Sequence, residues 1–193
     1  MIRLLVHRRA VLPIPGGLEH AGILHIAAEG GRADIVRLLL DAGLYVNLRS
    51  RTWHIVSRGD RDNWTALHFA AASNASEVAR LLIERHANVR ARDIHFGQEP
   101  LNLACEYGNE EIARILVEAG ADVNSCSTDG RTPLHNAAER GDTALVRFLI
   151  ERHANVHACN RQGHQPLHKA CFKGHKEVAQ FLLDVGADIE STS

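Results

Sequence analysis

Residues 131–141 read RTPLHNAAERG, and close variants of this stretch recur along the chain at a nearly fixed interval. The Leu-His pair at its centre, or a near match, returns at spacings of 43, 34, 33 and 33 residues. The pairs are Leu24-His25, Leu67-His68, Leu101-Asn102, Leu134-His135 and Leu167-His168. A period in the range of about 20–50 residues is typical of stacked repeat proteins, in which each unit contacts only its neighbours. We therefore expect an elongated array with a binding surface, and not a domain built around a catalytic pocket.

Each unit reads as two short antiparallel helices and a hairpin loop. Counted from the leucine, alanine stands at +3, glycine or asparagine at +7, glycine or histidine at +19, and valine or isoleucine at +22. In the fourth unit, Thr132 is placed to cap a helix, and Pro133 stands at its first position, where a missing N–H costs nothing. Gly141 ends this helix. The second helix, Thr143 to about Arg152, carries an apolar stripe too wide for a surface helix, so it should pack on two sides.

The TPLH opening at residues 132–135 and the ending GADVN at residues 120–124 resemble those of the ankyrin repeat family. The resemblance covers residues 18–190 and implies an all-α ankyrin-repeat solenoid of helix-turn-helix units with β-hairpin loops, here a natural, non-consensus array. One departure is that His86 and His153 replace a helix-ending glycine. A left-handed residue other than glycine costs roughly 1 kcal/mol there, so these two repeats should be locally weaker.

In the family, the histidine of the Leu-His pair hydrogen-bonds backbone between repeats. The resemblance therefore implies a structural role, and not a catalytic or metal-binding one, for the four histidines of this column. They are His25, His68, His135 and His168.

The repeat register divides the chain into seven segments. They are a partial preceding repeat and linker (1–17), repeat 1 (18–47), an insertion loop (48–61), repeat 2 (62–90), repeat 3 (96–124), repeat 4 (129–157) and repeat 5 (162–190). Residues 2–10 line up with residues 146–154 of an outer helix, so we expect a helix there that packs on repeat 1 through Leu4 and Leu5. Neither end is polar, as the caps of stacked arrays are. The chain reads as part of a longer array, with a native half-repeat cap as the alternative.

Composition excludes several classes of protein. A formal net charge of −1 offers no basic field to nucleic acid. The apolar run Ile2–Val6 is too short for a signal peptide or a membrane span, so we expect a cytoplasmic or nuclear protein with reduced cysteines. Cys105 and Cys171 share a small-residue column and should be packing residues. Cys126 and Cys159 are one repeat apart, about 10 Å, which exceeds the roughly 7 Å limit for a disulfide.

Catalytic and metal motifs are missing from the sequence. There is no Gly-rich phosphate loop, no Gly-x-Ser-x-Gly elbow and no His-Glu-x-x-His helix. A set of zinc-type side chains exists in the hairpins, but it lacks Cys-x-x-Cys spacing and comes from two different loops. Its members are Cys126, His157, Cys159 and His164. We expect no enzyme activity, no cofactor and no metal site.

The nine aromatic residues point to a binding face. Phe148 and Phe181 occupy a core column, and Tyr45 lies in a junction between repeats. Five others are predicted on the concave face or in the insertion, namely Trp53 in the insertion Arg49–Gly59, Trp64, Phe96 at a hairpin tip, Tyr107 and Phe172. Phe69 stands in a column that could be half buried. Exposed aromatics of this kind are typical interface anchors, so truncating Trp64 or Tyr107 should weaken binding and leave the fold nearly unchanged.

Charges add a second layer to this face. The hairpins carry three more arginines than acidic residues, which makes a weakly basic rim. The inner helices are acidic in the middle and basic toward the C-terminal end, where Arg140 and Lys173 stand. The predicted partner-binding residues are Trp64, Phe96, Tyr107, Arg131, Arg140, Phe172, Lys173 and Trp53.

We therefore expect a monomeric, non-catalytic protein–protein interaction module, a scaffold or adaptor, that binds a partner segment with acidic or apolar residues. The first alternative is nucleotide or oligonucleotide sensing. The ankyrin region of the oligoadenylate-activated ribonuclease stacks a base on an aromatic residue and holds phosphates with basic residues, but no lysine stands near the hairpin tips here. Its candidate residues are Trp64, Phe96, Arg92 and Arg131. The second alternative is a structural spacer within a larger protein, which buried concave aromatics would favour.

Residues 116–124, LVEAGADVN, resemble the ankyrin-loop sequence that the asparaginyl hydroxylase of the hypoxia pathway accepts in animal cells. The resemblance marks Asn124 as the candidate modification site. Asn47 is a poorer match, because Tyr45 replaces the acidic residue of that sequence.

Overall fold

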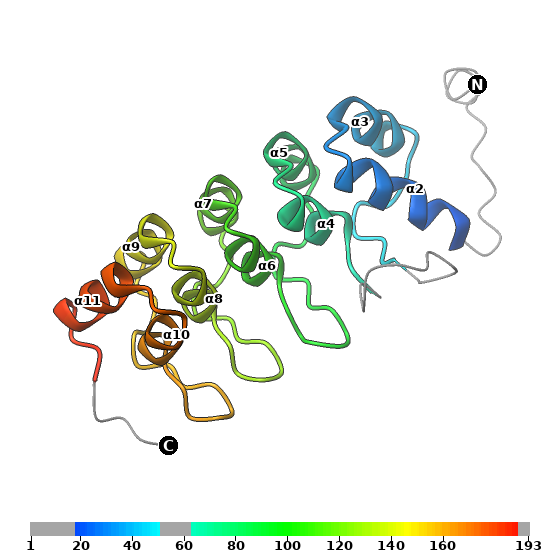
Figure 1. The fold of residues 1–193 in the computed structure, drawn as a ribbon. Helices are drawn as coiled ribbons and strands as arrows, with labels where there is room; N and C mark the ends of the chain where they lie inside the picture. The colour runs from blue at the N-terminus through cyan, green and yellow to red at the C-terminus, as the bar shows by residue number, and fades with distance from the viewer. Residues whose placement is uncertain (1–17, 51–62, 189–193) are drawn as a thin grey trace.

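The structure is a computed structural model that describes residues 18–50 and 63–188. Within these ranges, inner and outer helices alternate in five pairs. The helices are α2 (Leu18–Glu29), α3 (Ala33–Asp41), α4 (Ala66–Ala72), α5 (Ser76–Glu84), α6 (Pro100–Tyr107), α7 (Glu110–Glu118), α8 (Pro133–Arg140), α9 (Thr143–Glu151), α10 (Pro166–Lys173) and α11 (Lys176–Asp184). The pairs stack in one row, with hairpin loops projecting from a single side (Figure 1). The predicted all-α repeat array of paired helices is confirmed.

The inner helices open with a shared cap geometry. Thr132 is the N-cap residue of α8, in an extended conformation with φ −93° and ψ 166°. Its backbone N–H donates to Nδ1 of His135 at 3.1 Å, which satisfies a donor that the helix itself cannot pair. In α6 the cap is made by a different pair, since the N–H of Glu99 donates to Oδ1 of Asn102 at 2.9 Å. One geometry therefore accommodates two side-chain chemistries.

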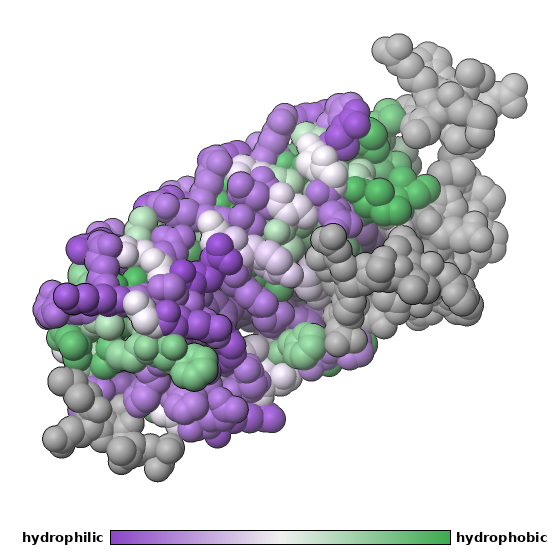
Figure 2. Space-filling view, in the orientation of Figure 1, coloured by the Kyte–Doolittle hydropathy of each residue, from purple (hydrophilic) through white to green (hydrophobic). Residues whose placement is uncertain are grey.

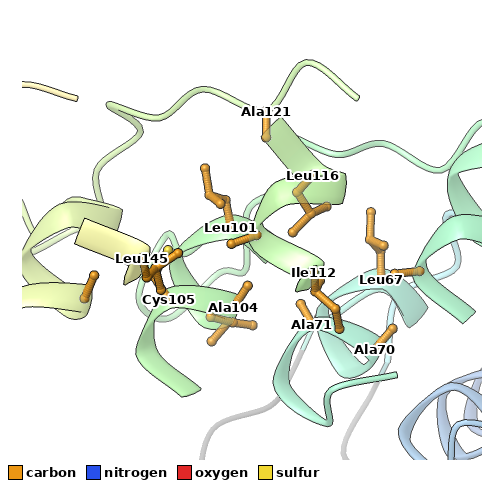
Figure 3. Packing of buried hydrophobic residues seen from close by; sticks show 14 of the residues in the cluster. Leu67, Ala70, Ala71, Leu101, Ala104, Cys105, Ile112, Leu116, Ala121 and Leu145 are labelled. Atoms are coloured by element: carbon orange, nitrogen blue, oxygen red, sulfur yellow. The ribbon is translucent and has the colours of Figure 1, made fainter. Parts of the chain in front are cut away.

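The core lies between successive helix pairs. Figure 3 shows small side chains of two neighbouring inner helices, such as Ala71 of α4 and Ala104 of α6, beside leucines of the same units. Cys105 and Phe148 are buried, as the column pattern predicts. The same prediction is wrong for Cys171, which is exposed. The reason is that no further repeat covers α10 within residues 63–188.

The two histidines at the ends of outer helices adopt the left-handed conformation. His86 has φ 64° and His153 has φ 67°, and Gly120 at the equivalent position of repeat 3 has φ 91°. For a residue with a Cβ this conformation costs free energy that glycine does not incur. The predicted backbone strain in repeats 2 and 4 therefore has a structural basis.

Replacing His86 or His153 by glycine is expected to raise the free energy of unfolding by up to about 1 kcal/mol in each case, because the strain is relieved. Urea-induced unfolding followed by circular dichroism measures the change. Gly120→Ala is the matched control and should shift stability in the opposite direction. A loss of stability in either histidine variant would show that the imidazole makes a stabilising contact.

Backbone hydrogen bonds close the base of the insertion. Arg49 and Thr65 form an isolated antiparallel bridge. The N–H of Ser50 donates to the carbonyl of Trp64 at 2.7 Å, and the N–H of Asn63 donates to the carbonyl of Ser50 at 2.9 Å. Each of the other hairpins in the described ranges is closed by one or two backbone hydrogen bonds within the loop, and none forms regular strands. The predicted helix over residues 2–9, and Trp53, lie outside the described residues.

No helix in residues 18–50 and 63–188 combines the length and the apolar character needed to cross a membrane.

Candidate protein-binding face

The histidine column holds the hairpins in place. Nε2 of His68 lies 3.2 Å from the carbonyl oxygen of Gln98, and Nε2 of His135 lies 2.9 Å from that of His164. Since Nδ1 of both rings accepts a backbone N–H, the proton is on Nε2, which donates to the next hairpin. His25 reaches the Leu48 carbonyl in the same way, at 3.1 Å. The predicted structural role is confirmed for these three; His168 makes the cap contact, with the Gln165 N–H at 3.2 Å.

Two of these histidines, His68 and His135, are neutral at pH 7. Burial lowers the pKa of His68 to about 4, and the hydrogen bond to the Gln98 carbonyl offsets only part of this effect. Burial likewise lowers the pKa of His135 to about 4, against the opposing effect of the His164 carbonyl. The rings of His68 and His135 therefore hold the hairpins through hydrogen bonds and carry no positive charge at pH 7.

Trp64 is not displayed, so its prediction as an exposed anchor is wrong. Its side chain is only 4% exposed. The indole meets the ring of Phe69 edge-on, with centroids 5.2 Å apart, and stacks near His68 at 5.9 Å. Backbone pairing with Ser50 holds the residue against this aromatic cluster. Phe69, which the pattern left open, is buried in the same cluster.

The tip of the third hairpin exposes apolar side chains. Phe96 is 47% exposed, as predicted, and Ile94, which sequence reasoning missed, is 64% exposed. The sequence contains a clue to this tip. The spacing of 34 between Leu67 and Leu101 exceeds the regular 33 by one residue, which the hairpin accommodates.

Two more of the predicted aromatics lie exposed at the ends of inner helices. Tyr107, the last residue of α6, is 43% exposed, and Phe172 in α10 is 82% exposed. The ammonium of Lys173 lies 5.8 Å from the centre of the Phe172 ring. In Figure 2, hydrophilic residues cover the middle of the array, and apolar residues gather near α2 and near α10 and α11.

A salt-bridge network joins the fourth hairpin to α8 and α10. The guanidinium of Arg131 contacts the carboxylate of Glu139, and Nζ of Lys173 lies 3.5 Å from the other oxygen of Glu139. Burial alone would raise the pKa of Glu139, but Arg131 and Lys173 outweigh it and the pKa is lowered. Arg131 therefore lies within the predicted face but is paired with the carboxylate of Glu139.

Positive charge remains in excess around this network. Arg140 is exposed, and its guanidinium donates to the Glu106 carbonyl oxygen at 3.1 Å. Lys169 adds a cation on α10. We call this group the α8–α10 basic cluster; its members are Arg131, Arg140, Lys169 and Lys173. With Glu139 as the one carboxylate among the residues of α8 and α10, the cluster has an excess of three positive charges.

The nucleotide-sensing alternative loses its key contacts in this geometry. Trp64 is buried and cannot stack on a base. Arg92 donates to Glu99 at 3.3 Å and to the Cys126 carbonyl at 2.6 Å, so it is also engaged. Buried concave aromatics would favour the spacer alternative. Trp64 and Phe69 are buried, whereas Phe96, Tyr107 and Phe172 are exposed.

The remaining candidate residues lie in separate hairpins. In the described ranges, no three His, Cys, Asp or Glu side chains are grouped so that they could hold a metal ion. The hairpin set that contains Cys126 and Cys159 therefore forms no such group. Asn124 is exposed, and its amide bridges to the next repeat, accepting from the Asn155 N–H at 2.8 Å and donating to the His153 carbonyl at 3.2 Å. Hydroxylation at Asn124 stays a prediction.

Known proteins share this architecture. A family model described as Ankyrin repeats (3 copies) matches residues 2–93, 24–127 and 101–193. The chain is 36% identical over 106 residues to Protein phosphatase 1 regulatory subunit 12A of Rattus norvegicus, which covers 54% of this chain and 10% of that protein. It is 33% identical over 129 residues to the B-cell lymphoma 3 protein homolog of Mus musculus, covering 65% of this chain and 26% of that protein.

A third relative is the Nuclear factor NF-kappa-B p105 subunit of Mus musculus, with 34% identity over 111 residues, 57% of this chain and 11% of that protein. The chain thus spans no more than 26% of the length of these three relatives. Ankyrin repeats are typically protein–protein interaction modules and are generally non-catalytic. Because the family model for ankyrin repeats matches residues 2–193 in three overlapping segments, this chain belongs to the ankyrin repeat family.

Proposed function

We propose that this chain is a non-catalytic interaction module that binds an acidic partner segment on the inner-helix face of α6, α8 and α10. The observation that carries the proposal is the side chain of Phe172, a large ring 82% exposed beside the α8–α10 basic cluster. An exposed aromatic ring with a cation beside it suits a partner that combines an apolar side chain with carboxylates. Tyr107, two repeats away, supplies a second ring on the same face.

The electrostatics favour an acidic partner over a basic one. Glu139 is already paired with Arg131 and Lys173, and Glu106 accepts from the side chain of Gln98 at 2.8 Å. The charge of Glu139 is thus balanced within the protein. Glu106 keeps its charge, but the four cations of the cluster still outnumber the two carboxylates of this face, and Arg140 is exposed. A partner carboxylate can therefore approach Arg140 without displacing an internal ion pair.

Binding can be tested with random peptides of about 16 residues displayed on phage, which span roughly 50 Å when extended. Selection on the intact chain should yield acidic peptides that contain an aromatic or aliphatic residue. For such peptides, Phe172→Ala should weaken binding by about 2 kcal/mol, or roughly 30-fold. Fluorescence anisotropy of labelled peptides measures the dissociation constants.

Matched controls exist on other faces of the same molecule. Tyr45 is an exposed aromatic after α3, and Lys176 is an exposed cation on α11. Tyr45→Ala and Lys176→Ala should leave peptide binding unchanged, whereas Arg140→Ala should slow association and reduce its salt dependence. Selected peptides without acidic residues, or full binding by Phe172→Ala, would exclude the proposed face.

A further inference from the structure

The third hairpin differs in chemistry from the two that follow it. Its tip is Ile94-His95-Phe96, which we call the hairpin-3 tip, and all three residues are exposed. The equivalent tips are Thr128-Asp129 in repeat 4 and Arg161-Gln162 in repeat 5, which are polar. The hairpin that contains the extra residue of this repeat thus exposes two apolar side chains, Ile94 and Phe96. Burial in the core does not explain an apolar tip, because Ile94 is 64% exposed.

Hydrogen bonds also hold the backbone of the hairpin-3 tip. The carboxylate of Asp93 is buried and accepts three backbone N–H groups, those of His95 at 2.9 Å, Phe96 at 2.7 Å and Gln98 at 3.0 Å. Gly97 turns the chain with φ 60°, and the carbonyl of Phe96 accepts the N–H of Thr128 at 2.7 Å. A displayed apolar group that is already ordered loses little conformational entropy on binding, which favours a role in recognition.

The tip lies next to the basic cluster through a continuous series of contacts. Phe96 is hydrogen-bonded to Thr128 in the fourth hairpin, which also holds Arg131. Arg131 contacts Glu139 on α8, and Glu139 contacts Lys173 on α10. One extended segment can therefore cover both sites. Along the stack, at about 10 Å per repeat, the third hairpin and α10 are separated by about 20 Å, or roughly six extended residues.

We infer that the partner is a two-part segment, with apolar residues that pack on Ile94 and Phe96 and, about six residues away, carboxylates that meet the α8–α10 basic cluster. This inference rests on the proposed function and adds the register of the partner. A tip with only two apolar side chains is too small for stable insertion into a bilayer.

The test uses the full chain and a peptide selected from the random phage library, synthesised both complete and without its apolar end. The tip variant is Ile94→Ser/Phe96→Ser, and the cluster variant is Arg140→Ala/Lys173→Ala. A matched control removes two exposed apolar side chains elsewhere, Ile26→Ser/Tyr45→Ser. We expect the tip variant to bind the complete peptide at least about tenfold more weakly and the shortened peptide unchanged. Circular dichroism and urea midpoints verify that each variant is folded.

The outcomes separate the two proposals. If the cluster variant loses affinity for the complete peptide and the tip variant does not, the two-part inference is overturned and the proposed function stands. If neither variant loses affinity, both are overturned. Co-sedimentation with vesicles of equal parts phosphatidylcholine and phosphatidylserine is the last arm. Retention of the wild type but not of the tip variant would assign the tip to a lipid surface and overturn the inference.

Discussion

Trp64→Ala is expected to lower the free energy of unfolding by about 3–5 kcal/mol, as much as truncation of a core leucine. The indole is 4% exposed and contacts the rings of Phe69 and His68, so its removal leaves a cavity in the second repeat. It also sits where the backbone of Ser50 pairs with that of Trp64, at the base of the insertion. Loss of the ring should therefore loosen repeat 2 and the insertion together.

Urea-induced unfolding gives the change in stability, and amide hydrogen exchange gives its location, because repeat arrays open unit by unit. Leu134→Ala, in a fully buried column, sets the scale at about 2–5 kcal/mol. Tyr107→Ala is the contrast, since that side chain is 43% exposed, and it should cost much less. If Trp64→Ala unfolded at the same urea concentration as the wild type, the ring would have to be displayed and not buried.

Acidification from pH 7 to pH 4 is expected to remove about 3 kcal/mol of stability for each of His68 and His135. Burial lowers the pKa of both rings from 6.5 to about 4 in the folded protein. The unfolded chain takes up these protons near pH 6.5, and the folded protein does not until about pH 4. The contribution is therefore complete above pH 6.5 and is lost as the pH falls through this window.

The third repeat supplies the control for this titration. There Asn102 takes the place of the histidine, accepting from the Glu99 N–H at 2.9 Å and donating to the Ser125 carbonyl at 3.2 Å. As Asn102 does in repeat 3, an asparagine at each site should keep the cap bond and donate to one hairpin carbonyl, without a group that titrates; the double variant is His68→Asn/His135→Asn. Thermal or urea unfolding between pH 7 and pH 4 should show a flatter dependence for this double variant. Equal slopes for the variant and the wild type would mean that other groups cause the acid sensitivity.

The proposed binding face combines a hydrogen-bonded scaffold with exposed side chains that do not contribute to that scaffold. The column histidines and Asp93 use hydrogen bonds to hold the hairpins, while Phe96 and Phe172 remain exposed. Peptide-binding measurements and unfolding measurements should therefore respond to different substitutions. A substitution that lowered both the peptide affinity and the free energy of unfolding by similar amounts would identify a residue of the scaffold.

The repeat period, the paired helices and their caps could be predicted from the sequence, because each depends on residues close together in one unit. Thr132 caps α8 through His135 three residues away, and the left-handed conformation of His153 depends on its own backbone position. The exposure of Phe172 and the burial of Phe148 also agree with their columns. These features are local, or repeat identically from one unit to the next.

Side-chain exposure at the hairpins depended instead on neighbours that differ between repeats. Trp64 stands in the column of Gln98 and Arg131, which are partly exposed, yet it is buried because Phe69 and the backbone of Ser50 meet it from other parts of the chain. Arg131 was expected on the rim and is held by Glu139, whose position depends on the fold of α8. A column predicts where a Cα lies, whereas the space and charge around its side chain are set by contacts between segments distant in the sequence.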